Sequence, residues 1–179
     1  MTTRDLVYIA LFAAISAATA IFPPITLPFG VPIVVQSIAP LLAGSIIGAW
    51  RGALAIVLFI AMVAIGLPLL SGARGGIAPL IAPAGGFIFS WIVVAAVVGY
   101  LIQRRHGQAG LTYRMVSNFI GAFVISYPIG IVWLSYSTGM TLQAAAFAAC
   151  AFIGGDIIKV IVASLVSRAL QRAYPIIIR

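Results

Sequence analysis

The 179-residue chain is 64% hydrophobic and only 7% charged, with a mean hydropathy of +1.24. Soluble domains carry about 25% charged residues, so this composition excludes a soluble globular protein and indicates an integral membrane protein. A net charge of +8 would suggest a nucleic-acid partner in a soluble protein. In a membrane protein it marks the cytoplasmic side, and no nucleic-acid partner is expected.

The first apolar run, residues 6–22, starts almost at Met1 and ends at Pro23-Pro24. We interpret it as the first membrane span, with Asp5 as its N-cap, because no small-residue cleavage site follows it and further apolar runs do. The next segment, residues 23–32, contains four prolines and cannot be helical. It is predicted to be an extended loop whose backbone needs protein or ligand around it.

Further apolar runs predict an all-α membrane protein with about six spans and no soluble domain, since each span needs about 20 residues. The spans after the first cover residues 33–49, 53–70, 87–103, 114–137 and 156–172. Short turns or loops join them, including a glycine-rich segment at residues 71–76 and a basic loop at residues 104–107.

The last apolar region, residues 141–172, is too long for one span. Gly154-Gly155 is predicted to divide it. Residues 142–153 would then form a short extra helix that enters or lies on the membrane, and the sixth span would begin at Asp156.

Charges orient this layout. One side carries a single arginine, Arg74, and the other carries the rest: Arg4, Arg51, Arg104, Arg105, Arg114, Arg168, Arg172 and Arg179. The positive-inside rule therefore places both termini in the cytoplasm. The proline-rich loop, the glycine-rich segment and the Gly154-Gly155 break then face outward, and we predict an outward-facing pocket walled by these loops.

Asp156 and Lys159 are predicted to lie at the floor of that pocket. Asp156 is one of only two acidic residues in the chain, and Lys159 is its only lysine. A charge near the bilayer centre costs about 2.5–3.5 kcal/mol, and residues at i and i+3 share a helix face, so the two charges offset each other. A helix cap neutralised by a lysine is the alternative to ligand binding.

Other polar residues have two interpretations each. Arg74 is either a solvated loop residue or a clamp for a ligand carboxylate. Gln36 is either a ligand contact or a structural side chain, and Asn118 is interpreted as helix–helix glue. The aromatic residues Trp91, Trp133, Tyr127 and Tyr136 either line the pocket or form an interfacial belt, which is the preferred reading for Tyr136.

A stripe of small residues, Ala10, Ala14 and Ala18, recurs at spacing four in the first span. Such a stripe allows close helix packing, either within the chain or against another membrane subunit. The sequence contains no P-loop, no Ser–His arrangement at membrane depth and no Cys/His cluster. We therefore expect neither an enzyme nor a metal or cofactor protein.

Several stretches together resemble the biotin-specific substrate-binding subunits of energy-coupling factor vitamin transporters, the BioY family. One is Gly155-Asp156-Ile157-Ile158-Lys159; the others are residues 25–33 with Gln36, 41–44, 51–55, 75–87 and 132–134. Their order and spacing extend over roughly residues 5–172. The family's usual Pro-Thr-Gly-Gly-Tyr reads Pro83-Ala84-Gly85-Gly86-Phe87 here, and its usual Pro-Gly-Asp reads Gly154-Gly155-Asp156.

The resemblance implies a six-helix subunit in a prokaryotic cell membrane that captures biotin outside. It implies a transmembrane coupling subunit and two ATPase subunits as partners, with the alanine stripe Ala10, Ala14 and Ala18 as the coupling surface. Asp156 and Lys159 would meet the ureido ring or the tail carboxylate. The remaining site residues would be Gln36, Arg74, Trp91 and Phe87, with Gly85 and Gly86 approaching the ligand by backbone.

Three alternatives remain open at this point. The same scaffold could bind another vitamin, such as thiamine or riboflavin. The chain could also be a stand-alone biotin transporter or facilitator. An intramembrane enzyme would need a buried nucleophile and base, and the single histidine, His106, lies in the basic loop.

Overall fold

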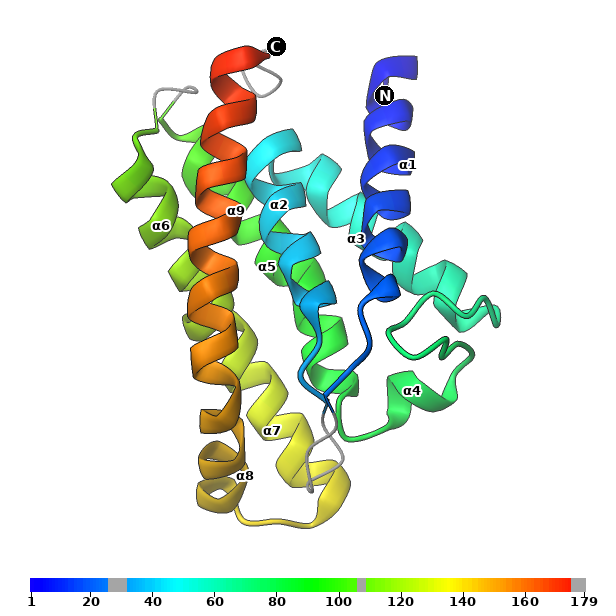
Figure 1. The fold of residues 1–179 in the computed structure, drawn as a ribbon. Coiled ribbons are helices and arrows are strands. Elements are labelled where there is room, and N and C mark those ends of the chain that lie inside the picture. Colours follow the sequence, from blue (N-terminus) through cyan, green and yellow to red (C-terminus); the bar gives the residue numbers. More distant parts are fainter. Residues whose placement is uncertain (26–31, 106–108, 175–179) are drawn as a thin grey trace.

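The computed structural model describes residues 1–25, 32–105 and 109–174, and this part of the chain is all-helical, with no strand (Figure 1). Its longer helices are α1 (Thr3–Ala18), α2 (Ile38–Ile47), α3 (Ala49–Ala64), α5 (Gly85–Gln103), α6 (Leu111–Phe119), α7 (Tyr127–Thr138), α8 (Leu142–Ala149) and α9 (Ile153–Ala173). Short helical pieces are Thr19–Ile21, Val35–Ser37, α4 (Ala78–Ile81) and Cys150–Phe152, and a π-helix, Ile120–Ser126, joins α6 to α7.

Within the described residues, four continuous helical stretches are long and apolar enough to cross a membrane: Thr3–Ile21, Gly85–Gln103, Leu111–Thr138 and Leu142–Ala173. Two shorter apolar helices, Val35–Ile47 and Ala49–Ala64, complete the set. All six follow the order of the predicted spans. The third helix ends earlier than predicted, at Ala64, because Gly66 adopts a positive φ of 107° and Pro68 follows.

The predicted break at Gly154-Gly155 is displaced. The change in helix type falls at Cys150–Phe152, where a 3₁₀ turn joins α8 to α9, and both glycines lie in the first turn of α9. A Cβ atom at Gly154 would have no neighbour within 4 Å. Nothing beside this position forces the helix to open, and glycine alone lowers helix propensity by only about 1 kcal/mol.

The N-terminus of α1 also differs from the prediction, because Thr2 and not Asp5 is the N-cap. The Asp5 backbone N–H donates to Thr2 Oγ1 at 3.3 Å and the Thr2 N–H donates to Asp5 Oδ2 at 2.8 Å, a reciprocal capping box. Asp5 Oδ1 also pairs with Arg51 Nε at 2.7 Å. This carboxylate therefore fastens α1 to the start of α3.

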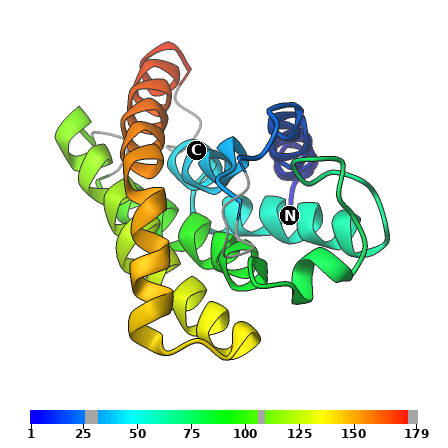
Figure 2. The same ribbon diagram turned by 60° about the horizontal axis from the view of Figure 1, so that its bottom comes forward.

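Helix α5 occupies the centre of the bundle, with α2 beside it, α1 and α3 on one side and α7 and α9 on the other (Figure 2). The α2–α3–α5 contact is close because glycines lie at the crossings. A Cβ atom on Gly44 would fall well under 3.0 Å from the backbone oxygen of Ala95, and one on Gly99 would meet the backbone of Ala49. Small residues let membrane helices approach to backbone contact.

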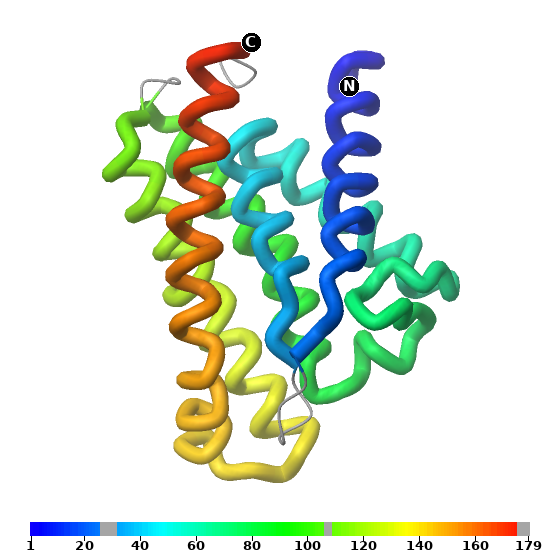
Figure 3. Tube along the Cα trace, viewed as in Figure 1, coloured from blue at the N-terminus to red at the C-terminus, as the bar shows by residue number. Residues whose placement is uncertain are grey.

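The interior also holds a polar junction between α2, α6 and α9. Ser45 Oγ donates to Asn118 Oδ1 at 3.0 Å, and Asn118 Nδ2 donates to Ser164 Oγ at 2.9 Å. The interpretation of Asn118 as helix–helix glue is confirmed. The described N- and C-terminal residues lie at the same end of the bundle (Figure 3), while Arg179, His106 and residues 26–31 of the proline-rich loop lie outside the described residues.

Candidate ligand-binding site

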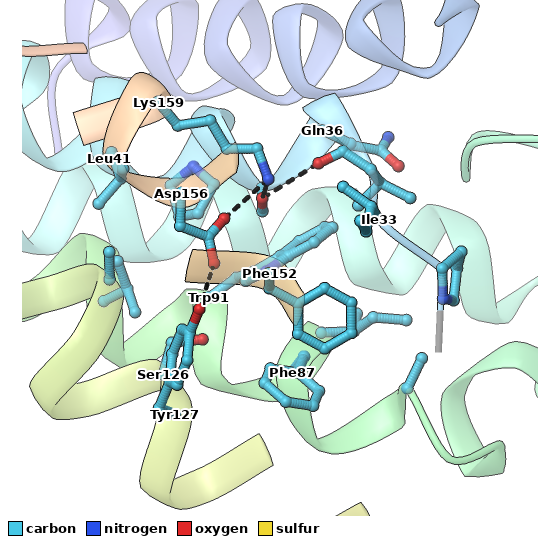
Figure 4. Close-up of a pocket in the computed structure, with 18 of the residues that line it drawn as sticks. Ile33, Gln36, Leu41, Phe87, Trp91, Ser126, Tyr127, Phe152, Asp156 and Lys159 are labelled. Carbon is cyan, nitrogen blue, oxygen red and sulfur yellow. Dashed lines mark hydrogen bonds and ion pairs between the residues drawn. The ribbon is translucent and has the colours of Figure 1, made fainter. Parts of the chain in front are cut away.

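A pocket lies in the half of the bundle away from the termini, where α2, α5 and α9 begin (Figure 4). The space between its walls is about 830 Å³ when the open solvent at its mouth is included. Among the described residues most of its lining is helical, and the predicted proline-rich and glycine-rich segments contribute Pro32 and Arg74. The pocket is lined by Pro32, Ile33, Val34, Gln36, Ser37, Pro40, Leu41, Leu70, Arg74, Ala84, Phe87, Ile88, Trp91, Val94, Ala122, Ser126, Tyr127, Phe152, Asp156 and Lys159.

Asp156 and Lys159 both line this pocket, one turn apart near the start of α9. Lys159 Nζ lies 2.8 Å from Asp156 Oδ1, and the two side chains are only 12% and 17% exposed. The first turn of a helix also favours a negative charge. The pair is thus electrically neutral, largely buried and held at the edge of the cavity.

Two further residues complete this cluster. Lys159 Nζ donates to Ser37 Oγ at 2.8 Å, and Tyr127 OH donates to Asp156 Oδ2 at 3.0 Å (Figure 4). Each carboxylate oxygen therefore has one protein donor and keeps lone pairs for other donors. Sequence reasoning left Tyr127 between the pocket and the aromatic belt and did not single out Ser37, which has no spacing signal in common with Asp156.

The π-helix before α7 brings Tyr127 to the pocket. A π-helical segment is wider than an α-helix and shifts the residues that follow around the helix axis. At its end, Ser126 Oγ lies 2.8 Å from Ser90 Oγ on α5. Trp133 and Tyr136, farther along α7, line a separate shallow groove on the outside of the bundle.

Aromatic rings form the apolar wall. Phe87 and Phe152 meet edge to face with ring centroids 5.9 Å apart, and Phe87 meets Tyr127 in the same way at 6.4 Å. Trp91, 4% exposed, lies behind them on α5. Phe87 and Trp91 are therefore pocket residues, as predicted, and Phe152 is an addition.

Arg74 lies at the rim of the pocket, on the loop between α3 and α4. Its Nε donates to the Ser71 carbonyl at 3.0 Å, which fixes the guanidinium, and the side chain is half-buried. The two acidic side chains of the chain are engaged by Arg51 and Lys159. No aspartate or glutamate of this chain therefore balances the charge of Arg74.

Gln36 borders the pocket but is only 1% exposed. Its Nε2 donates to the carbonyls of Ser16 and Leu69, both at 2.8 Å, and its Oε1 accepts the Ser71 N–H at 3.1 Å and the Ser71 hydroxyl at 3.4 Å. These contacts join α1 and the α3–α4 loop to the start of α2.

Gly85 and Gly86 are buried and do not line the pocket. A Cβ atom on Gly85 would collide with the Leu80 carbonyl, and one on Gly86 would collide with the Trp133 side chain. These glycines let α5 pack against α4 and α7. The sequence had instead predicted that their backbone approaches a ligand. Glycine alone does not distinguish the two roles, because it permits close helix packing as readily as close ligand approach.

The arrangement suits a small, partly apolar organic molecule with hydrogen-bond donors at one end and a negative charge at the other. The anchored carboxylate can accept hydrogen bonds, the rings offer apolar surface, and the Arg74 guanidinium offers a positive charge. Within the described ranges, no three His, Cys, Asp or Glu residues lie close enough together to hold a metal ion.

Comparison with known proteins gives one consistent result. The family model described as "BioY family" matches residues 1–176. The chain is 45% identical to "Biotin transporter BioY" of Rhizobium etli, covering 99% of this chain and 98% of that protein. It is 39% identical to the protein of that name from Rhodobacter capsulatus, covering 96% and 95%. A solved structure, the S-component for biotin from an ECF-type ABC transporter, superposes with a TM-score of 0.90 at 26% identity, covering 96% of this chain and 95% of that one.

Proposed function

Since the chain belongs to the BioY family, we propose that it is the high-affinity biotin-binding subunit of an energy-coupling factor importer. It would capture biotin on the outer side and deliver it inward with ATP-driven partner subunits, and it is a transport protein and not an enzyme. The observation that carries the proposal is the pocket itself, in which an anchored carboxylate, an aromatic wall and an unbalanced arginine occur together.

Biotin has a chemical counterpart for each of these three features. Its neutral ureido ring carries two N–H donors and a carbonyl, its thioether ring is apolar, and its tail ends in a carboxylate. A neutral Asp156–Lys159 pair suits the neutral ureido end, because Asp156 accepts N–H groups and Lys159 donates to the carbonyl. Arg74 suits the tail carboxylate, and Phe87, Trp91 and Phe152 cover the ring between them.

The membrane arrangement in this proposal has six spans, both termini in the cytoplasm of a prokaryotic cell and the pocket open to the outside. It is supported by the shared position of the described termini, at the end opposite the pocket (Figure 3). Eight arginines were predicted to be cytoplasmic, and seven of them belong to described residues. Arg74, the one arginine predicted to face outward, lies at the pocket rim. This is the asymmetry that the positive-inside rule expects.

The partner subunits would be a transmembrane coupling subunit and two ATPase subunits. Ala10, Ala14 and Ala18 are all exposed on α1, so the stripe is accessible over about two turns. The proposal places the coupling subunit on this face, where small side chains allow a second helix to approach closely.

Titration calorimetry of the purified protein in detergent tests the ligand, with biotin, thiamine and riboflavin measured in parallel. Submicromolar binding of biotin alone is the expected result. Folded, ligand-free protein that gives no heat with biotin would contradict the proposal, and heat with thiamine or riboflavin instead would move the assignment to that vitamin.

Tyr127→Phe is expected to weaken biotin binding about three- to tenfold, because one hydrogen bond that orients the Asp156 carboxylate is lost. The same calorimetric titration measures it. Tyr136→Phe is the matched control, since Tyr136 is 87% exposed on the outer face of α7, and this variant should bind like wild type. Wild-type affinity in Tyr127→Phe would argue against an oriented carboxylate.

Ala14→Trp is expected to reduce assembly with the coupling and ATPase subunits while leaving biotin binding unchanged. A bulky ring on this exposed position would separate the two packed helices. Co-purification with the partner subunits is the measurement, and Ala169→Trp, exposed on α9, is the control that should assemble normally. Full assembly of Ala14→Trp would place the docking surface elsewhere.

A further inference from the structure

The Gln36 carboxamide forms two hydrogen bonds with the backbone of the α3–α4 loop, as the backbone of a neighbouring strand would. Its amide nitrogen donates to the Leu69 carbonyl at 2.8 Å, and its amide oxygen accepts the Ser71 N–H at 3.1 Å. One carboxamide thus pairs with the backbone on both sides of Leu70. The second amide hydrogen goes to the Ser16 carbonyl on α1, also at 2.8 Å.

The turn held in this way is the one that carries Arg74. Leu70 and Arg74 exchange backbone hydrogen bonds of 3.0 and 3.2 Å, and Arg74 Nε returns to the Ser71 carbonyl at 3.0 Å. Between them, Gly72 and Ala73 adopt positive φ values of 81° and 55°. Ala73 has a side chain in this sparsely populated region, so the surroundings must hold the turn in its shape.

Gln36 has no hydrogen-bonding capacity left for a ligand. A carboxamide has two donor hydrogens and two acceptor lone pairs, and all four are used by Ser16, Leu69 and Ser71. The residue is only 1% exposed, so it stabilises the structure behind the pocket surface and does not present a polar group to a ligand.

We propose that Gln36 is a positioning residue that presents the Arg74 guanidinium to the carboxylate end of the ligand and does not itself bind the ligand. The inference rests on the proposed function for the identity of the ligand. Its physical basis is that Arg74 reaches the pocket rim only while the turn of residues 70–74 stays fastened to α2. The contact with Ser16 ties the same turn to α1.

A comparison of biotin with its methyl ester tests this role, because the ester lacks the negative charge that Arg74 would meet. Wild type should bind biotin about tenfold more tightly than the ester. Gln36→Met, which fills the volume without any hydrogen bond, and Arg74→Gln should each remove this preference while ester binding stays within about twofold of wild type. The double variant should behave like either single one.

Gln103→Met is the matched control. Gln103 Oε1 accepts the Ala49 N–H at 3.1 Å at the opposite end of the bundle, so this variant should keep the full preference for biotin. Equal weakening of biotin and ester in Gln36→Met would overturn the proposal in favour of a direct ligand contact.

Hydrogen exchange of the ligand-free protein provides a readout that does not depend on biotin. In Gln36→Met the Ser71 and Arg74 amides should exchange at least about tenfold faster than in wild type, while amides of α5 stay unchanged. Unchanged exchange at both amides would overturn the positioning role. A wild-type protein that binds neither ligand would overturn the proposed function, and the exchange result would still decide the role of Gln36.

Discussion

Asp156→Asn is expected to weaken biotin binding about a hundredfold, equivalent to about 3 kcal/mol. The substitution keeps the shape of the side chain but removes its charge, so ureido N–H groups lose a charge-assisted acceptor. It also leaves the Lys159 ammonium, on a side chain that is 12% exposed, without its partner in a region of low dielectric. Titration calorimetry in detergent measures the loss.

The control is the same substitution at the only other acidic residue. Asp5→Asn removes a carboxylate that lies in the capping box of α1 and pairs with Arg51, at the far end of the bundle from the pocket. It should cost stability and leave biotin affinity as in wild type. If Asp156→Asn and Lys159→Ala both bind biotin like wild type, the site lies elsewhere.

Gly44→Val is expected to prevent folding of the bundle or to destabilise it by about 3 kcal/mol or more. A Cβ atom at this position would fall well under 3.0 Å from the Ala95 backbone oxygen and would approach the Gly99 N–H. Backbone atoms of α5 cannot rotate away as a side chain could, so α2 and α5 would have to separate. Thermal unfolding in detergent, followed by size-exclusion chromatography, measures the effect.

Gly154→Val is the control for this prediction, since a Cβ atom there meets nothing within 4 Å. Its effect should stay within about 0.5 kcal/mol of wild type, because glycine is already the poorer helix former. A destabilisation as large as that of Gly44→Val would show that α9 bends or packs at this glycine. A stable Gly44→Val protein would contradict the close α2–α5 contact.

Many features of the site could be predicted because they are local in the chain. Asp156 and Lys159 are three residues apart, and helix geometry alone places such residues on one face. The scarcity of carboxylates in an apolar chain then marks the pair as costly and therefore as a candidate for ligand binding. Phe87 and Trp91 follow an irregular segment and Arg74 lies within one, and all three line the pocket.

The contacts that complete the site are long-range and could not be predicted. Tyr127 reaches Asp156 across 29 positions, and Ser37 reaches Lys159 across 122. Gln36 looked like a ligand contact, yet its partners, 20 and 33–35 positions away, use all of its hydrogen bonds. Gly85 and Gly86 were predicted to contact the ligand, but they lie against α4 and α7. A glycine in the sequence does not show whether a ligand or another helix needs the space of the missing side chain.

The membrane class, the order of six apolar helices and the charge asymmetry between their two ends can all be read along the chain, because hydropathy and charge act through composition and short-range period. The family followed from motifs read in order along the chain. Three outcomes depend on long-range packing: helices line most of the described pocket wall, Tyr127 holds the Asp156 carboxylate, and Gln36 holds the turn that bears Arg74. Those outcomes depend on which helices cross at glycines, and crossing geometry is set by packing between distant segments.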